Sequence, residues 1–270
     1  MTKPGKQCNH STRIQLLGLL FSTLIVSAVT ARTEAAAFGW GTPGLEAAAS
    51  ASIKVVTKQK KGVYKVEVEC PHFDDQTRVG RYANDEANYN ADGSLHLALQ
   101  QIDPYGDARA DGTQKFDTQK VKISLNTKEL VSYFTTEEAS NFGHQMMVFC
   151  YSYGMVEGSV RKLSINDIFT EGSDWKAKLA RPFISRLKSS PNAKELMSST
   201  FSQDEKECFE DWSRRSEFVL SKSGIECVLG ARQNKSGNFE PSVLSISFSE
   251  IQGIDKKGPL KPLFNSANKN

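Results

Sequence analysis

The chain has 270 residues, of which 39% are hydrophobic and 24% are charged, with 34 Lys and Arg residues against 31 Asp and Glu residues. This composition excludes a disordered or fibrous protein, and the length is enough for one large domain or two small ones. The charge is too evenly balanced to predict a polybasic surface.

The N-terminus has the pattern of a secretory signal peptide. Residues Ile14 to Val29 are nearly all apolar or small and follow three basic residues, Lys3, Lys6 and Arg13. The run is short and interrupted by polar residues, so a membrane span is not predicted, with an uncleaved N-terminal anchor as the alternative. Cleavage could follow Ala31 or Ala37. We favour Ala37, which gives a signal peptide over residues 1–37 and a secreted or periplasmic protein.

Removal of residues 1–37 takes away four basic residues and one acidic residue, which leaves 30 of each. The remaining chain is therefore neutral, and its charge gives no reason to expect nucleic acid or an anionic membrane as a partner.

Four cysteines remain after residue 37, and an even number in an exported chain predicts two disulfides. The four are Cys70, Cys150, Cys208 and Cys227. Three connectivities are open; the local choice pairs Cys208 with Cys227 and leaves Cys70 with Cys150. Each bond would stabilise the fold by about 3 to 5 kcal/mol in the chain-entropy description. The spacings do not match those of metal or redox motifs.

The first predicted elements are a flexible lead and two strands. Residues 38–52 mix Gly, Pro and Ala without a period, which indicates a flexible lead. A strand is predicted over Ile53 to Lys58. After a turn at Gly62, a second strand over Tyr64 to Cys70 alternates apolar and charged residues and is predicted to end at Pro71.

Residues 72–115 are rich in Asp, Asn and Gly and predict irregular structure containing a hairpin. Within them, Asn88 to Gly93 copies the first half of a calcium loop. The carboxylate expected at the twelfth position is replaced by Leu99, so a hairpin turn is favoured and no metal site is predicted.

Three more strands are predicted over Val121 to Leu125, Leu130 to Phe134 and Gln145 to Tyr153. The third is apolar on both faces, which predicts a central, buried strand.

A helix beginning near Asp174 is predicted from an apolar residue at every fourth position: Trp175, Leu179, Phe183 and Leu187. Pro182 predicts a kink or a break near Lys178.

The last third of the chain predicts a second helix, a hairpin and a final strand. A capping box at Ser202 to Glu205 begins the helix, which buries Cys208, Phe209 and Trp212. A hairpin over residues 218–229 and a strand over residues 244–248 follow. The sequence therefore predicts one α+β domain over residues 53–254, mainly an antiparallel sheet with a few helices packed on one face, stapled by disulfides, and a flexible tail over residues 255–270.

Nothing in the sequence has the spacing of a known catalytic motif. The histidines after residue 37 are His72, His96 and His144, and none belongs to a nucleophile elbow or a zinc-protease pair. His144 is interpreted as structural. No catalytic, cofactor-binding or metal-binding residue is predicted.

One stretch resembles a known family. It contains Gly143-His144, the strand ending in Tyr151-Ser152-Tyr153, Gly158, Leu163-Ser164-Ile165-Asn166-Asp167-Ile168-Phe169 and a helix starting at Trp175. In this order the residues resemble a bacterial extracytoplasmic family of unassigned function. That family includes the outer domain of a lysozyme-sensing anti-sigma factor and the non-catalytic N-terminal part of a peptidoglycan deacetylase. The resemblance covers residues 53–253 and is strongest over residues 143–187.

The resemblance implies a non-catalytic binding domain of the cell envelope, with lysozyme or peptidoglycan as candidate partners. Two departures are the loop over residues 231–241, which lacks the usual tyrosines and alanines, and the elaborate insert between Cys70 and Val121. A cell-wall hydrolase or esterase with an unrecognised site is the alternative, and a purely structural envelope protein is a third.

Overall fold

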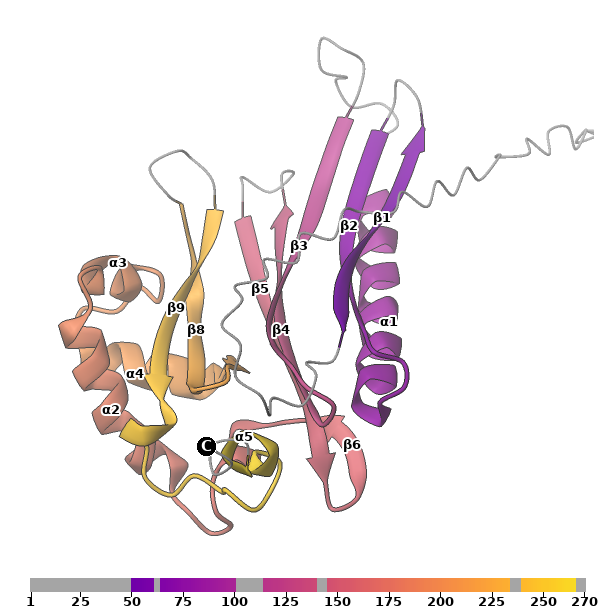
Figure 1. Ribbon diagram of the computed structural model, residues 1–270. Helices are drawn as coiled ribbons and strands as arrows, with labels where there is room; N and C mark the ends of the chain where they lie inside the picture. The colour runs from indigo at the N-terminus through magenta and orange to yellow at the C-terminus, as the bar shows by residue number, and fades with distance from the viewer. Residues whose placement is uncertain (1–49, 61–63, 101–113, 140–144, 234–238, 266–270) are drawn as a thin grey trace, which may run out of the picture.

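The computed structural model describes residues 50–60, 64–100, 114–139, 145–233 and 239–265. These residues form two β-sheets that meet at one end and diverge at the other, each covered by helices on its outer face (Figure 1). The α+β class and the mainly antiparallel sheet are confirmed. The expected single helical face is not found, because α1 covers one sheet while α2, α3 and α4 pack with the other.

The larger sheet has six strands in the order β1-β2-β3-β4-β5-β6, and every pair is antiparallel except β2 with β3. Helix α1 provides the crossover between those two parallel strands. The elements are β1 (Ala51–Lys60), β2 (Tyr64–Phe73), α1 (Arg78–Gln100), β3 (Gln114–Asn126), β4 (Leu130–Ala139), β5 (Gln145–Val156) and β6 (Ser159–Lys162).

The smaller sheet has the antiparallel order β7-β8-β9. Its strands and the helices around it are η2 (Ile165–Ile168), α2 (Trp175–Ser189), α3 (Ala193–Ser198), α4 (Glu205–Arg215), β7 (Phe218–Leu220), β8 (Gly224–Gln233), β9 (Phe239–Ser247), η3 (Phe248–Glu250) and α5 (Lys261–Asn265). Within the ranges given above, none of the helices has both the length and the hydropathy that crossing a bilayer requires.

Helix α1 replaces the irregular segment and hairpin that were predicted from the Asp, Asn and Gly residues. Its buried face is built from small residues at helical spacing: Val79, Ala83, Ala87, Ala91, Leu95 and Ala98. The interpretation of Asn88 to Gly93 as a hairpin turn is wrong, because these residues lie inside the helix. For the same reason they do not form the loop that a calcium site of this pattern requires. No group of three potential metal ligands occurs among the described residues.

One buried side chain fixes α1 to the sheet. The Oδ1 atom of Asn84 accepts a hydrogen bond of 2.8 Å from the backbone N–H of Phe73, and its Nδ2 donates to the Phe73 carbonyl at 3.0 Å. Asn84 thereby satisfies both polar backbone groups of the last residue of β2, beyond the point where β2 pairs with β3.

The protein has two hydrophobic cores: one between α1 and the larger sheet, and a second between the smaller sheet and its helices. In α2, Leu179, Phe183 and Leu187 are fully buried as predicted, and Phe183 packs on Trp212 of α4 with ring centroids 5.4 Å apart. The predicted break near Lys178 is absent: α2 is one continuous helix that contains Pro182. Within the range assigned to a tail, Leu260 is fully buried and residues 261–265 form α5.

The predicted disulfides are wrong, because Cys70, Cys150, Cys208 and Cys227 are all unpaired. Cys70 lies on β2 and Cys150 on β5, three strand spacings apart or about 14 Å, whereas bonded cysteines have Cα atoms within about 7 Å. Cys208 and Cys227 are fully buried in the second core and pack as small apolar residues. The Cys208 sulfur accepts a hydrogen bond from Thr200.

Strand β5 was predicted to be central, but the structure places it next to the short edge strand β6. Strand β6 pairs only with Tyr153 to Val156, so the first part of β5 pairs on one side alone among the strands that the structure describes. Accordingly, Met147 and Phe149 are 47% and 39% exposed. The uncovered part of β5 positions the candidate site described below.

Replacing Asn84 with alanine should lower the free energy of unfolding by about 2 to 3 kcal/mol, because the buried N–H of Phe73 would lose its partner. Urea denaturation followed by circular dichroism measures this loss. The control is Asn88→Ala, one turn further along the same helix at an exposed position, where, among the described residues, the side chain accepts only the weak hydrogen bond of the Cys70 thiol and satisfies no backbone group. Equal effects of the two substitutions would contradict the assigned role of Asn84.

A thiol reductant should leave the melting temperature unchanged, because none of these four cysteines is bonded. Alkylation of the unfolded protein without reductant, followed by mass spectrometry, should label all four. A peptide pair recovered as a disulfide, or a fall in melting temperature on reduction, would contradict the structure.

Candidate functional site

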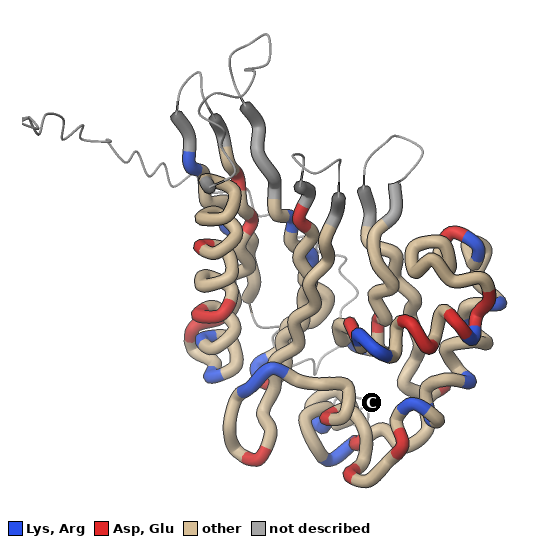
Figure 2. The backbone as a smooth tube through the Cα atoms, turned by 180° about the vertical axis from the view of Figure 1, so that it is seen from behind, with Lys and Arg blue, Asp and Glu red and all other residues tan. Residues whose placement is uncertain are grey.

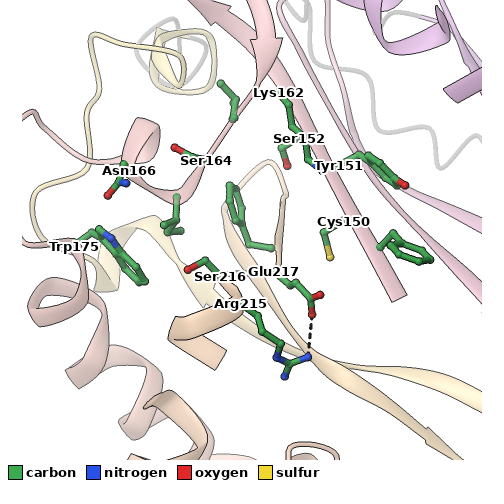
Figure 3. Close-up of a pocket in the computed structure, with 14 residues that line it drawn as sticks. Cys150, Tyr151, Ser152, Lys162, Ser164, Asn166, Trp175, Arg215, Ser216 and Glu217 are labelled. Carbon is green, nitrogen blue, oxygen red and sulfur yellow. Dashed lines mark hydrogen bonds and ion pairs between the residues drawn. The ribbon is translucent and has the colours of Figure 1, made fainter. Parts of the chain in front are cut away.

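The site is a cleft of about 440 Å³ beside the uncovered part of β5 (Figure 3). Three chain segments line it, together with Trp175: residues 149–152 of β5, residues 162–166 from the end of β6 into η2, and residues 215–218 from the end of α4 to the start of β7. Successive residues of a strand point to opposite faces of a sheet, so a cleft lined by four of them in a row runs along the edge of the strand.

The first wall forms where the chain leaves the sheet. Leu163 donates its N–H to the carbonyl of Ser152 at 2.7 Å, and the next residues turn into η2. Asp167 fixes this turn, because its carboxylate accepts hydrogen bonds from the Ser164 N–H at 2.7 Å and from Arg161 at 2.9 Å. Before Ser152, no strand of the described part of the chain pairs with this edge of β5, which is called bare here in that sense.

The second wall forms at the C-terminus of α4. Ser216 takes the left-handed conformation (φ 52°, ψ 38°) and turns the chain toward β7. The indole Nε1–H of Trp212 donates to the carbonyl of Glu217 at 2.8 Å, which fixes the start of β7 to the helix. Arg215 donates to the carbonyl of Leu229 at 2.8 Å and to the carboxylate of Glu217 at 3.1 Å.

The charged groups of the cleft differ in how well they are paired. Arg215 and Glu217 form an ion pair, whereas the ammonium group of Lys162 lies over the ring of Tyr151, 4.6 Å from its centroid. Lys162 makes no ion pair within 4 Å with any residue that the structure describes. Although Lys162 as a whole is exposed, partial burial of its ammonium group lowers its pKa, against the opposing effects of Cys150, Glu86 and Glu217. The charged residues that line the cleft, Lys162, Arg215 and Glu217, therefore carry a net positive charge.

Two other groups in the cleft are shifted toward their neutral forms. Burial raises the pKa of Cys150 to about 12; the nearby Glu217 adds to this, and Lys162 and Arg215 oppose it. Burial also raises the pKa of Glu217, against Arg215 and Lys162. The Cys150 thiol is therefore protonated at neutral pH and a weak nucleophile.

The arrangement is suited to binding, and no nucleophile and base meet among the residues that line the cleft. The hydroxyl of Ser152 lies 2.7 Å from that of Ser132 in a buried pair. His72 lies 3.5 Å from Asp75 at the end of β2, and His96 lies on α1; neither lines the cleft. His144 lies outside the described residues.

Of the four cysteines that the sequence singled out, Cys150 alone lines the cleft. Two stretches that carry the family resemblance, Tyr151-Ser152 and Leu163 to Asn166, also line it. Sequence reasoning missed Lys162, Arg215 and Glu217. The only available signal was the position of Lys162 directly before the Leu163 to Phe169 motif.

Alkylation of native Cys150 should accelerate about tenfold per pH unit from pH 8 to pH 11, because only the thiolate reacts and its pKa is about 12. Mass spectrometry of the Cys150 peptide after timed exposure to iodoacetamide measures the rate. The same peptide in urea-unfolded protein is the control and should level off near pH 9. A plateau below pH 9.5 in the folded protein would contradict the shift.

No family model matches the chain, and no curated protein matches it. Six chains of solved structures do, among them the following two. A member of the DUF3298 family from Bacteroides fragilis NCTC 9343 shares 13% identity, with a TM-score of 0.48, over 82% of this chain and 98% of that one. A DUF3298 family protein from Pseudomonas aeruginosa PAO1 shares 14% identity, with a TM-score of 0.41, over 78% of this chain and 96% of that one. Both of these structural neighbours are DUF3298 family proteins of low sequence identity to this chain.

Proposed function

We propose that this chain is a non-catalytic binding domain of the bacterial cell envelope, secreted or periplasmic, and that its partner occupies the cleft beside β5. The observation that carries the proposal is the cleft itself, which opens along a bare strand edge. Partly exposed Phe149 and half-buried Trp175 provide apolar contact area, and Lys162 provides an unpaired charge. Aromatic residues beside hydrogen-bonding groups are typical of surfaces that bind other molecules.

The family resemblance suggests lysozyme or peptidoglycan as the partner. The hydroxyl and amide groups of Ser164, Asn166 and Ser216 lie on the same side of the cleft as Trp175, as Figure 3 shows. Such a surface suits a protein segment, through apolar contacts and backbone hydrogen bonds, and also suits a glycan or stem peptide. Lysozyme and soluble peptidoglycan fragments are therefore the two ligands to test first.

The chemistry of the cleft supports binding over hydrolysis. A hydrolase needs a nucleophile within hydrogen-bond reach of a base. The cleft offers Cys150, whose raised pKa keeps it protonated, and Ser152, whose hydroxyl is engaged with Ser132. It also offers Ser164, whose hydroxyl donates to Asp167, a carboxylate already bound by Arg161, and Ser216, whose hydroxyl donates to the carbonyl of Ser213. None of them has a histidine beside it among the lining residues.

Export is compatible with the unpaired cysteines. Cys70, Cys208 and Cys227 are buried, and burial raises the pKa of each thiol. Buried, protonated thiols react slowly with oxidants. Positions of Lys and Arg are interspersed with positions of Asp and Glu along the backbone of the described chain, as Figure 2 shows.

The test is a calorimetric titration of the purified protein with lysozyme and, separately, with soluble peptidoglycan fragments. One of them should bind, and Phe149→Ser should weaken that binding about tenfold or more, since exposed aromatic residues often dominate interfaces. Phe201→Ser is the matched control, because Phe201 is 95% exposed and does not line the cleft.

Two outcomes would contradict the proposal. Failure of both ligands to bind would reject the named partners, and equal effects of Phe149→Ser and Phe201→Ser would reject the cleft. Mass spectrometry of the peptidoglycan fragments after incubation provides a further check, because cleaved products would favour the hydrolase alternative.

A further inference from the structure

Building on the proposed function, we infer that the partner contributes an extended peptide segment, which pairs with the bare edge of β5 as an added strand and places a carboxylate against Lys162. The inference depends on which backbone groups face the cleft, on how the sheet edges are protected, and on the charge of the cleft.

The pairing pattern of β5 directs free backbone groups into the cleft. The carbonyl of Ser152 accepts from Leu163, so the polar backbone groups of Ser152 point away from β4. These groups alternate in direction along an antiparallel strand, and those of Cys150 and Val148 therefore point the same way. No described strand pairs with these two residues on that side, because β6 begins to pair at Tyr153.

The opposite wall presents backbone groups of the same kind. Glu217 pairs with β8 through its carbonyl, which accepts from the N–H of Val228, so the next residue, Phe218, turns its N–H and C=O away from β8. The same alternation directs the N–H of Leu220 to the hydroxyl of Ser132. An extended peptide in the cleft therefore has backbone donors and acceptors on two sides.

The bare part of β5 lacks the protection that sheet edges usually have. Proteins place lysine, proline or other blocking features on exposed edges to prevent pairing with another chain. Strand β1, at the far edge of the same sheet, carries the exposed lysines Lys54 and Lys58. Residues 145–152 of β5 contain neither charge nor proline, and Met147 and Phe149 are exposed there. This edge is therefore open to an added strand.

The charge of the cleft selects the chemistry of the peptide. Glu217 neutralises Arg215, whose guanidinium also binds the carbonyl of Leu229. Lys162 keeps its charge without a carboxylate partner and lies opposite Tyr153, where the bare edge ends. A peptide that pairs with Val148 and Cys150 has its end near this ammonium group. An Asp or Glu side chain, or a terminal carboxylate, is the group that complements it.

The experiment selects peptides from a displayed library of random linear decapeptides on the purified protein. The best one is synthesised and titrated by calorimetry. It should contain a carboxylate, and methylation of alternate backbone nitrogens in the peptide should weaken binding at least tenfold, whereas methylation of the nitrogens between them should matter little. That alternation is the signature of strand pairing.

Two protein variants and one control locate the contact. Lys162→Gln removes the charge without touching the backbone and should weaken binding about tenfold. Val148→Pro removes an N–H that points away from β4, so the ladder is retained while the edge is blocked, and binding should be lost. Lys54→Gln, on the β1 edge, should have no effect. On binding, amide exchange at Val148 and Cys150 should slow at least tenfold, which tests the pairing in the unmodified protein.

Enrichment of no peptide, or peptide binding that is indifferent to both Lys162→Gln and backbone methylation, would overturn the inference. The proposed function would still stand if lysozyme or peptidoglycan bound in a manner sensitive to Phe149→Ser. Conversely, slowed exchange at Val148 and Cys150 with a selected peptide would support strand addition even if both of those ligands failed to bind.

Discussion

The hydroxyl group of Ser132 joins the two sheets of this protein. It accepts the N–H of Leu220 at 2.8 Å, lies 2.7 Å from the hydroxyl of Ser152, and is fully buried. A short polar link of this kind sets where β7 meets β4 and β5, because the N–H of Leu220 would cost about 1 to 3 kcal/mol if left unsatisfied. This contact fixes β7 against β4 and β5. The residues that precede β7 then lie at a distance from the part of β5 before Ser152, and the cleft lies between these two segments.

The motif that carries the family resemblance has a structural role here. Leu163, Ile165, Ile168 and Phe169 are buried in the second core, and Asp167 holds the turn between them. These contacts end β6 after four residues and pull the chain away from the sheet. The motif thus makes the cleft without specifying what binds in it. Residues that preserve a shape can be shared by proteins with different partners, so the resemblance suggests a partner without identifying it.

The sequence predicted the helices and strands that have a clear local pattern of apolar residues. Prediction failed for features that depend on strand pairing, and for a helix whose buried face is made mostly of alanine. Strand β2 and helix α2 have clear apolar periods. Helix α1 was missed because alanine forms most of its buried face, while Asn and Asp were taken as turn formers. Three features depend on strand order, which periodicity does not contain. They are the place of β5, the separation of Cys70 from Cys150, and the presence of Lys162 and Glu217 in one cleft. The cleft could not be predicted for the same reason.

The parallel contact between β2 and β3 bears on the order of folding. Strands β1 and β2 form one hairpin and β3 to β6 form a meander, so each half of the larger sheet can assemble from neighbours in the chain. Joining the halves requires α1 to cross over first, and its many Asn and Asp residues give it little helicity of its own. We therefore expect the crossover to complete only when its alanine face docks, and this long-range step to limit the folding rate of the domain.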